Sequence, residues 1–161
     1  MMYPVRSTAP QPHEDMSPSV QELYRESGEV FGISRRAGAA LARATLERLL
    51  KELDPDAGKL DLAGRIERIT PTVSGSLGQM LTVIRHAGNK SLHVEDQPDD
   101  VIVLILDPEE DGVVEIIFQS INDLVEELVT RPARAQALFE KVPQGVRDNV
   151  GKRAEKPLAS D

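Results

Sequence analysis

The chain contains no cysteine and no tryptophan, and only 3% of its residues are aromatic. The lack of cysteine excludes disulfides, thiolate metal ligands and a cysteine nucleophile. The scarcity of aromatic rings argues against a surface on which single-stranded nucleic-acid bases stack. It also predicts an aliphatic core. No apolar run approaches the roughly 18 residues of a membrane span, so we expect no membrane segment.

Acidic residues outnumber basic ones, and the 161 residues carry a formal net charge of -8. Phosphate backbones repel such a chain at long range, which argues against non-specific nucleic-acid binding but leaves a local basic site open. The segment Met1–Ser17 lacks the basic start and apolar middle of a signal peptide. Together with the absence of cysteine, this favours a cytoplasmic protein.

Proline and polar residues mark both ends of one predicted domain, whose length suffices for a hydrophobic core. Residues 1–17 are predicted to be a flexible N-terminal arm, residues 18–142 a single helical domain, and residues 143–161 a flexible C-terminal tail without apolar periodicity. The fold class is mainly α. Apolar spacing within the domain predicts helices over about 18–32, 34–53, 60–69, 74–92, 122–130 and 131–142.

Two β-branched runs interrupt this helical pattern. Residues 101–106 and 113–118 flank a segment rich in proline, aspartate and glycine. Such a pattern predicts a small β-hairpin over about 101–118, inserted before the C-terminal helices. The alternative is that the second run joins the helix that follows it.

The predicted helix over 34–53 has two distinctive features. Its first half, from Ala37 to Ala42, consists almost entirely of small residues. Small residues allow another helix to approach closely, which predicts either a tight helix contact or a dimer seam. The same helix carries arginines that form either a basic ridge for RNA or a solvated face: Arg35, Arg36, Arg43 and Arg48.

The richest side-chain chemistry lies in the predicted helix over 74–92. Arg85, Asn89 and His93 are spaced at i, i+4 and i+8 and therefore share one helix face. An arginine, an amide and an imidazole can bind a phosphate and move a proton. They can equally form a hydrogen-bonded seam between helices, in which Arg85 pairs with Glu47 or another acid while Asn89 and His93 cap the helix.

Other kinds of site are weakly indicated. His86 and His93 are near acidic residues, but the spacing of a compact metal site is missing, so we expect no metal. The glycine-rich segment 74–78 is not followed by the lysine of a phosphate loop, so we expect no bound nucleotide cofactor.

Three segments carry a family resemblance: the alanine-rich Arg36–Leu50 segment, then Leu62–Ile66, then Ile84–His93. Their order and spacing over about residues 34–93 resemble the bacterial domain-of-unknown-function family numbered 4145. That family looks HEPN-like, that is, similar to the helical higher-eukaryote and prokaryote nucleotide-binding domains. The resemblance implies a HEPN-like helical bundle, a homodimer and a role in antiviral defence.

The resemblance also implies roles for individual residues. Carried over by position, Arg85 and His93 become the catalytic pair of a metal-independent endoribonuclease, with Asn89 between them. By helix geometry, His86 lies on the same side of the helix as His93 and is an alternative base, and Arg43 and Glu47 of the long helix are auxiliary residues. The interval between Arg85 and His93 is longer than in the HEPN motif.

Two functions follow as hypotheses. The first is a HEPN-like defence-associated protein that cleaves RNA as a dimer. The alternative is a non-catalytic module for dimerisation or interaction, which docks onto a larger defence or restriction protein.

Overall fold

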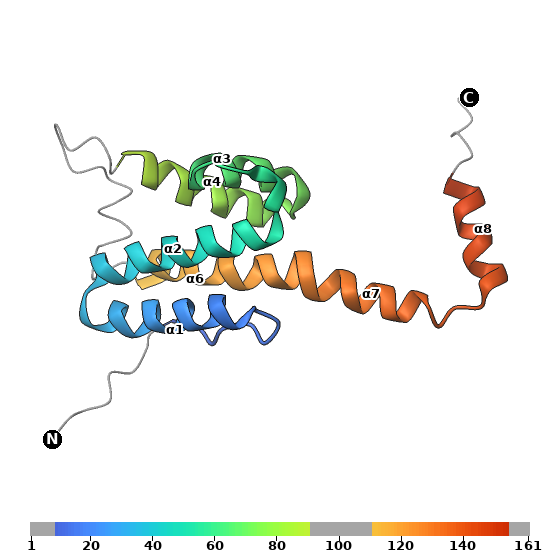
Figure 1. Ribbon diagram of the computed structural model, residues 1–161, viewed down its shortest axis with the longest axis horizontal. Coiled ribbons are helices and arrows are strands. Elements are labelled where there is room, and N and C mark those ends of the chain that lie inside the picture. Colours follow the sequence, from blue (N-terminus) through green and yellow to red (C-terminus); the bar gives the residue numbers. More distant parts are fainter. Residues whose placement is uncertain (1–8, 91–110, 155–161) are drawn as a thin grey trace, which may run out of the picture.

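A computed structural model describes residues 9–90 and 111–154 and arranges them as a helical bundle with a projecting end (Figure 1). The bundle consists of α1 (Pro18–Ile33), α2 (Arg35–Leu53), α3 (Leu62–Ile69), α4 (Gly75–Lys90) and α6 (Asp111–Val125). No strand forms within the described ranges. The prediction of a mainly α fold is confirmed.

Side-chain caps fix where the first helices begin. Ser17 accepts a hydrogen bond from the Val20 amide at the start of α1, where Pro18 is the first helical residue. Equivalent caps at α2 and α3 use Ser34 and Asp61. Each cap satisfies an amide that has no partner within its helix, which is worth about 1 kcal/mol. Short turns that contain proline separate the next helices: η1 (Pro55–Ala57) and η2 (Thr70–Thr72).

The core lies where α2 contacts α1, α3 and α6. Phe118 of α6 makes edge-on contacts with Tyr24 and Phe31 of α1, with ring centroids 5.2 Å and 6.0 Å apart. Burial raises the pKa of the Tyr24 hydroxyl above its ordinary value, although its hydrogen bond with Asn122 lowers it. As expected, the rest of the core is aliphatic and includes Leu46, Leu50, Leu81, Ile84, Ile121 and Leu124.

The predicted β-hairpin is wrong in its second half, because residues 113–118 lie in α6. Apolar residues at i, i+1, i+4, i+7 and i+8 form one face of this helix and are buried. The β-branched run is therefore the beginning of that face, and the residues that follow continue it. The alternative prediction, that the second run joins the following helix, is confirmed. The first half of the hairpin, residues 101–106, lies outside the described residues. The buried face comprises Ile117, Phe118, Ile121, Leu124 and Val125.

Instead of ending with the bundle, α6 continues through the π-helical turn η3 (Glu126–Thr130) into α7 (Arg131–Phe139). Separate helices were predicted to meet at Arg131. Pro132 cannot donate the backbone hydrogen bond of an α-helix, and the wider π turn comes directly before α7. The chain therefore stays helical past the proline, and α7 projects beyond the bundle (Figure 1).

The structure describes a helix or tertiary contacts within both segments that were predicted to be flexible. After Pro143, whose carbonyl accepts from Val146 and Arg147, the chain forms α8 (Gln144–Ala154) within the predicted tail. In the predicted N-terminal arm, the His13 amide donates to Asn122 Oδ1 at 2.9 Å. The His13 ring lies 3.0 Å from Glu126 Oε2. These contacts join positions far apart in sequence, so apolar periodicity gave no sign of them.

Glu127 connects η3 to the start of α4. Its carboxylate accepts hydrogen bonds from the Ser74 amide at 2.8 Å and the Ser74 hydroxyl at 2.6 Å. Burial raises the pKa of Glu127, but the two bonds from Ser74 and the positive charge of Arg131 together hold that pKa below its ordinary value. The helix that carries the candidate site is therefore anchored at the residue directly before it.

Candidate functional site

Arg85 lies on the surface of α4, beside α3. Its side chain is 39% exposed, and its Nη2 donates to Glu67 Oε2 at 3.2 Å. The structure therefore supplies an acidic partner from α3, where the sequence had suggested Glu47 or another acid of the long helix. The Nε of Arg85 is buried and has no hydrogen-bond acceptor among the described residues. One guanidinium group thus combines an exposed edge with an unpaired inner donor.

The predicted stripe extends only partly into the described residues. The backbone of Asn89 lies in α4, one helical turn after Arg85, as the spacing predicted. The side chain of Asn89 and the whole of His93 lie outside the described residues. His86 is exposed on the same turn as Arg85. The juxtaposition of Arg85 with His93 therefore stays a prediction.

Arg43 reaches the same turn of α4 from α2. Its Nη1 donates to the Ile84 carbonyl at 3.3 Å. Burial lowers the pKa of Arg43, and the nearby Glu47 carboxylate raises it. Glu47 itself forms an ion pair with Lys51 at 2.7 Å. Arg43 therefore links α2 to the turn of α4 that carries Arg85, and Glu47 lies beside Arg43 on α2.

The other arginines of α2 do not form one ridge. Arg35 lies over the Phe31 ring at 5.7 Å. Arg48 forms an ion pair with Glu52 at 3.5 Å, and Arg36 is exposed. Since Arg43 is half-buried and donates to α4, it does not extend a basic surface from the other three arginines. A continuous RNA-binding ridge on α2 is not what the structure has.

The small residues of α2 serve a contact inside the chain. Gly38 is buried against the backbone of Phe31 in α1, so close that a Cβ atom on Gly38 would lie 2.3 Å from the Phe31 Cα. Ala42 is fully buried on the same side of the helix. Of the two predictions for this segment, the tight helix contact is confirmed. This side of α2 faces α1 and is not free to form a dimer seam.

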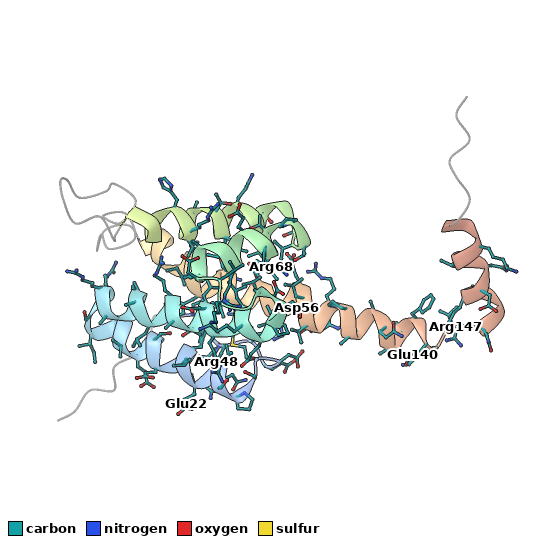
Figure 2. The ribbon with its side chains drawn as sticks, turned by 45° about the horizontal axis from the view of Figure 1, so that its top comes forward. Glu22, Arg48, Asp56, Arg68, Glu140 and Arg147 are labelled. Atoms are coloured by element: carbon teal, nitrogen blue, oxygen red, sulfur yellow. The ribbon has the colours of Figure 1, made fainter. Side chains whose placement is uncertain are left out.

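The second candidate site is the projecting end of the chain, residues 131–154, which we call the arm. Every residue of α7 is exposed. Figure 2 shows Glu140 and Arg147 on the arm, well away from the side chains of the bundle. Apolar side chains on the arm remain in contact with solvent: Leu138, Phe139, Val146 and Val150.

The arm is basic, whereas the helix that leads to it is acidic. Residues 111–130 contain five acidic residues and no lysine or arginine. The arm contains Glu140 and Asp148 as its only acids. The arm also contains six basic residues: Arg131, Arg134, Lys141, Arg147, Lys152 and Arg153. In an acidic chain, this concentration of positive charge beside exposed apolar groups indicates an interaction surface.

Sequence patterns could have suggested the arm only in part. The apolar periodicity of residues 135–142 reads as a buried helix face, whereas the structure leaves that face open. The signal that remained was charge, because six of eight ionisable groups in residues 131–154 are basic. Within the described residues, no cluster of histidine and acidic side chains is arranged to hold a metal ion. None of the described helices is long and apolar enough to cross a membrane.

Comparison with known proteins gives one match. A family model described as a domain of unknown function (DUF4145) matches residues 25–141. The matched region extends from α1 to just after α7, beyond the segments on which the resemblance rested. Searches of curated proteins and of solved structures each return no match.

Proposed function

We propose that this chain, which belongs to the DUF4145 family of domains of unknown function, is a helical interaction module. The module holds a protein partner through its arm. The observation that carries this proposal is α7, a helix whose residues are all exposed and whose main contact within the described part of the chain is the turn that precedes it. A helix gains most of its stability by packing an apolar face, and Leu138 and Phe139 supply such a face.

The composition of the arm favours protein over nucleic acid as the partner. Leu138 is 59% exposed and Phe139 is 44% exposed. Phosphate backbones are bound by charge and gain little from large apolar groups. Protein interfaces place aromatic and aliphatic side chains at their centre and charged groups at the rim. The arm combines both kinds of group on consecutive helical turns.

Site-directed photo-crosslinking tests this role. Because the chain has no cysteine, a Leu138→Cys variant carries one benzophenone label and reports on the arm alone. Illumination of the labelled protein, by itself and in an extract of its source cells, is expected to give adducts of defined mass. Gln79→Cys on the exposed face of α4 is the matched control and should give few. Equal yields from the two positions would contradict docking through the arm.

A second candidate function is cleavage of RNA by a HEPN-like dimer. The observation that favours it is one turn of α4 that carries Arg85 and the exposed His86 and accepts a hydrogen bond from Arg43 at the Ile84 carbonyl. In this mechanism, His93 or His86 takes the proton from a ribose 2′-hydroxyl, which attacks the adjacent phosphate. The bond from phosphorus to the 5′-oxygen of the next nucleotide breaks, that oxygen takes a proton from the histidine or from water, and a 2′,3′-cyclic phosphate remains. Arg85 stabilises the charge that develops on the phosphate oxygens. Its ion pair with the largely exposed Glu67 opens at little cost, since such pairs are worth at most about 1 kcal/mol.

RNA cleavage in the presence of EDTA tests the second candidate. We expect Arg85→Ala and His93→Ala each to lower the rate about 100-fold or more, the usual size of a lost acid–base or charge-stabilising group. Arg36→Ala removes an exposed arginine from α2 and serves as the control, with an unchanged rate. If all variants and the wild type cleave equally, or if the wild type cleaves no RNA of varied sequence and structure, the α4 stripe is not catalytic.

A further inference from the structure

The exposed face of α1 carries an acidic stripe, defined by Glu22, Glu26 and Glu29. These positions are spaced at i, i+4 and i+7, so the three carboxylates lie in one row. All three are exposed, and none forms an ion pair with a described residue. The row ends at Ile33, which is 76% exposed. Arg25, also exposed, borders this row at i+3 from Glu22, so the face carries three carboxylates and one guanidinium, a net charge of −2, followed by one apolar group.

A matching basic stripe lies on α7, defined by Arg131, Arg134 and Leu138. The spacing i, i+3 and i+7 places these side chains on one face of the helix. Arg131 lies near Glu127 of the preceding turn, whose pKa it helps to lower. Arg134 forms no ion pair within the described part of the chain. Both stripes thus consist of charged residues followed, towards the carboxyl end of the helix, by one exposed apolar residue.

The two stripes cannot meet within one chain. The run from α6 through η3 to α7 is a continuous helical rod, and it carries α7 beyond the end of the bundle where α1 begins (Figure 1). Two arms cannot pair with each other favourably either, because each arm carries four more positive than negative charges. The basic stripe of α7 is therefore complementary to an acidic helix face on another molecule.

We infer that α7 docks onto the acidic stripe of a second copy of this chain, so that two copies exchange their arms. The inference rests on the proposed function and names its partner. A two-fold axis across the arms makes the contact reciprocal and closes the assembly at two copies. When Leu138 is set beside Ile33 with the two helices parallel, Arg134 faces Glu29 and Arg131 faces Glu26. Two oppositely charged pairs and one apolar pair then match, and Glu22 lies beyond the start of α7.

Charge reversal with a mixing control tests this arrangement in the full-length chain. Sedimentation velocity is expected to show a dimer of the wild type that weakens with added salt. Arg134→Glu alone and Glu29→Arg alone should each raise the dimer dissociation constant about ten-fold or more, because both contacts in the dimer become like-charged. An equimolar mixture of these two variants should dimerise again, since every contact then joins opposite charges. Arg36→Glu is the control and should dimerise like the wild type.

The outcomes separate this inference from the function on which it rests. A monomeric wild type, or a dimer that neither reversal weakens, overturns the exchange of arms. A mixture that stays monomeric while each variant remains folded by circular dichroism overturns it as well. If Leu138→Cys then gives adducts only with a different protein, the interaction module stands and its partner is not a second copy. If Leu138→Cys gives no adducts above the control, the proposed function fails with it.

Discussion

Replacing Phe118 with alanine is expected to lower the free energy of unfolding by about 3–5 kcal/mol, the usual cost of truncating a large buried aromatic side chain. Phe118 is 1% exposed, and its ring contacts those of Tyr24 and Phe31. No other described aromatic pair joins α6 to α1. Since small domains are stable by only about 5–15 kcal/mol, this one substitution removes a large fraction of the total.

Urea unfolding followed by circular dichroism at 222 nm measures the effect. Phe139→Ala removes the same side chain from the exposed arm and should change stability by no more than about 0.5 kcal/mol. Phe118→Leu keeps most of the volume and should cost about 1.5 kcal/mol, so the position stays measurable if the alanine variant does not fold. A loss below about 1 kcal/mol in Phe118→Ala would contradict the helical packing of residues 117–125 against α1.

The same residue shows where sequence reasoning about the fold succeeds and where it fails. Helices α1 and α2 were predictable because Ser17 and Ser34 cap them and their apolar residues repeat with helical spacing. Residues 113–118 combine β-branched and apolar side chains, which strand and helix can both accommodate in a short window. Only the packing of Phe118 between α1 and the following turns decides between them. That packing depends on tertiary contacts, which a short stretch of sequence does not reveal.

The candidate site, too, was predictable from the sequence only in part. The spacing of Arg85 and Asn89 predicted a shared helix face, and both positions lie in α4. The partner of Arg85 was not predictable, because Glu67 approaches only through the packing of α3 on α4. The arm was missed for the opposite reason. Periodicity identifies an apolar helix face but not whether anything covers it, so the open face of α7 looked like another buried one.

Replacing Gly38 with alanine is expected to lower the free energy of unfolding by about 2 kcal/mol, within the usual range for an overpacked site. The new Cβ atom would lie 2.3 Å from the Phe31 Cα and 2.6 Å from the Phe31 amide nitrogen. These are backbone atoms of α1, so no side-chain rotation relieves the contact and the two helices must separate. The gain of about 1 kcal/mol in helix propensity opposes this cost without cancelling it.

Urea unfolding of Gly38→Ala beside Gly75→Ala measures the contribution of the close contact. A Cβ atom on Gly75, at the start of α4, would meet nothing within 4 Å, so that variant should be as stable as the wild type or slightly more stable. A double-mutant cycle with Phe31→Ala then identifies the atoms responsible. Because the clash involves the backbone of Phe31, truncating its side chain should leave most of the Gly38→Ala penalty in place. If the penalty disappears in the Phe31→Ala background, the ring sets the separation of α1 and α2, and the small residues of α2 serve only to make room for it.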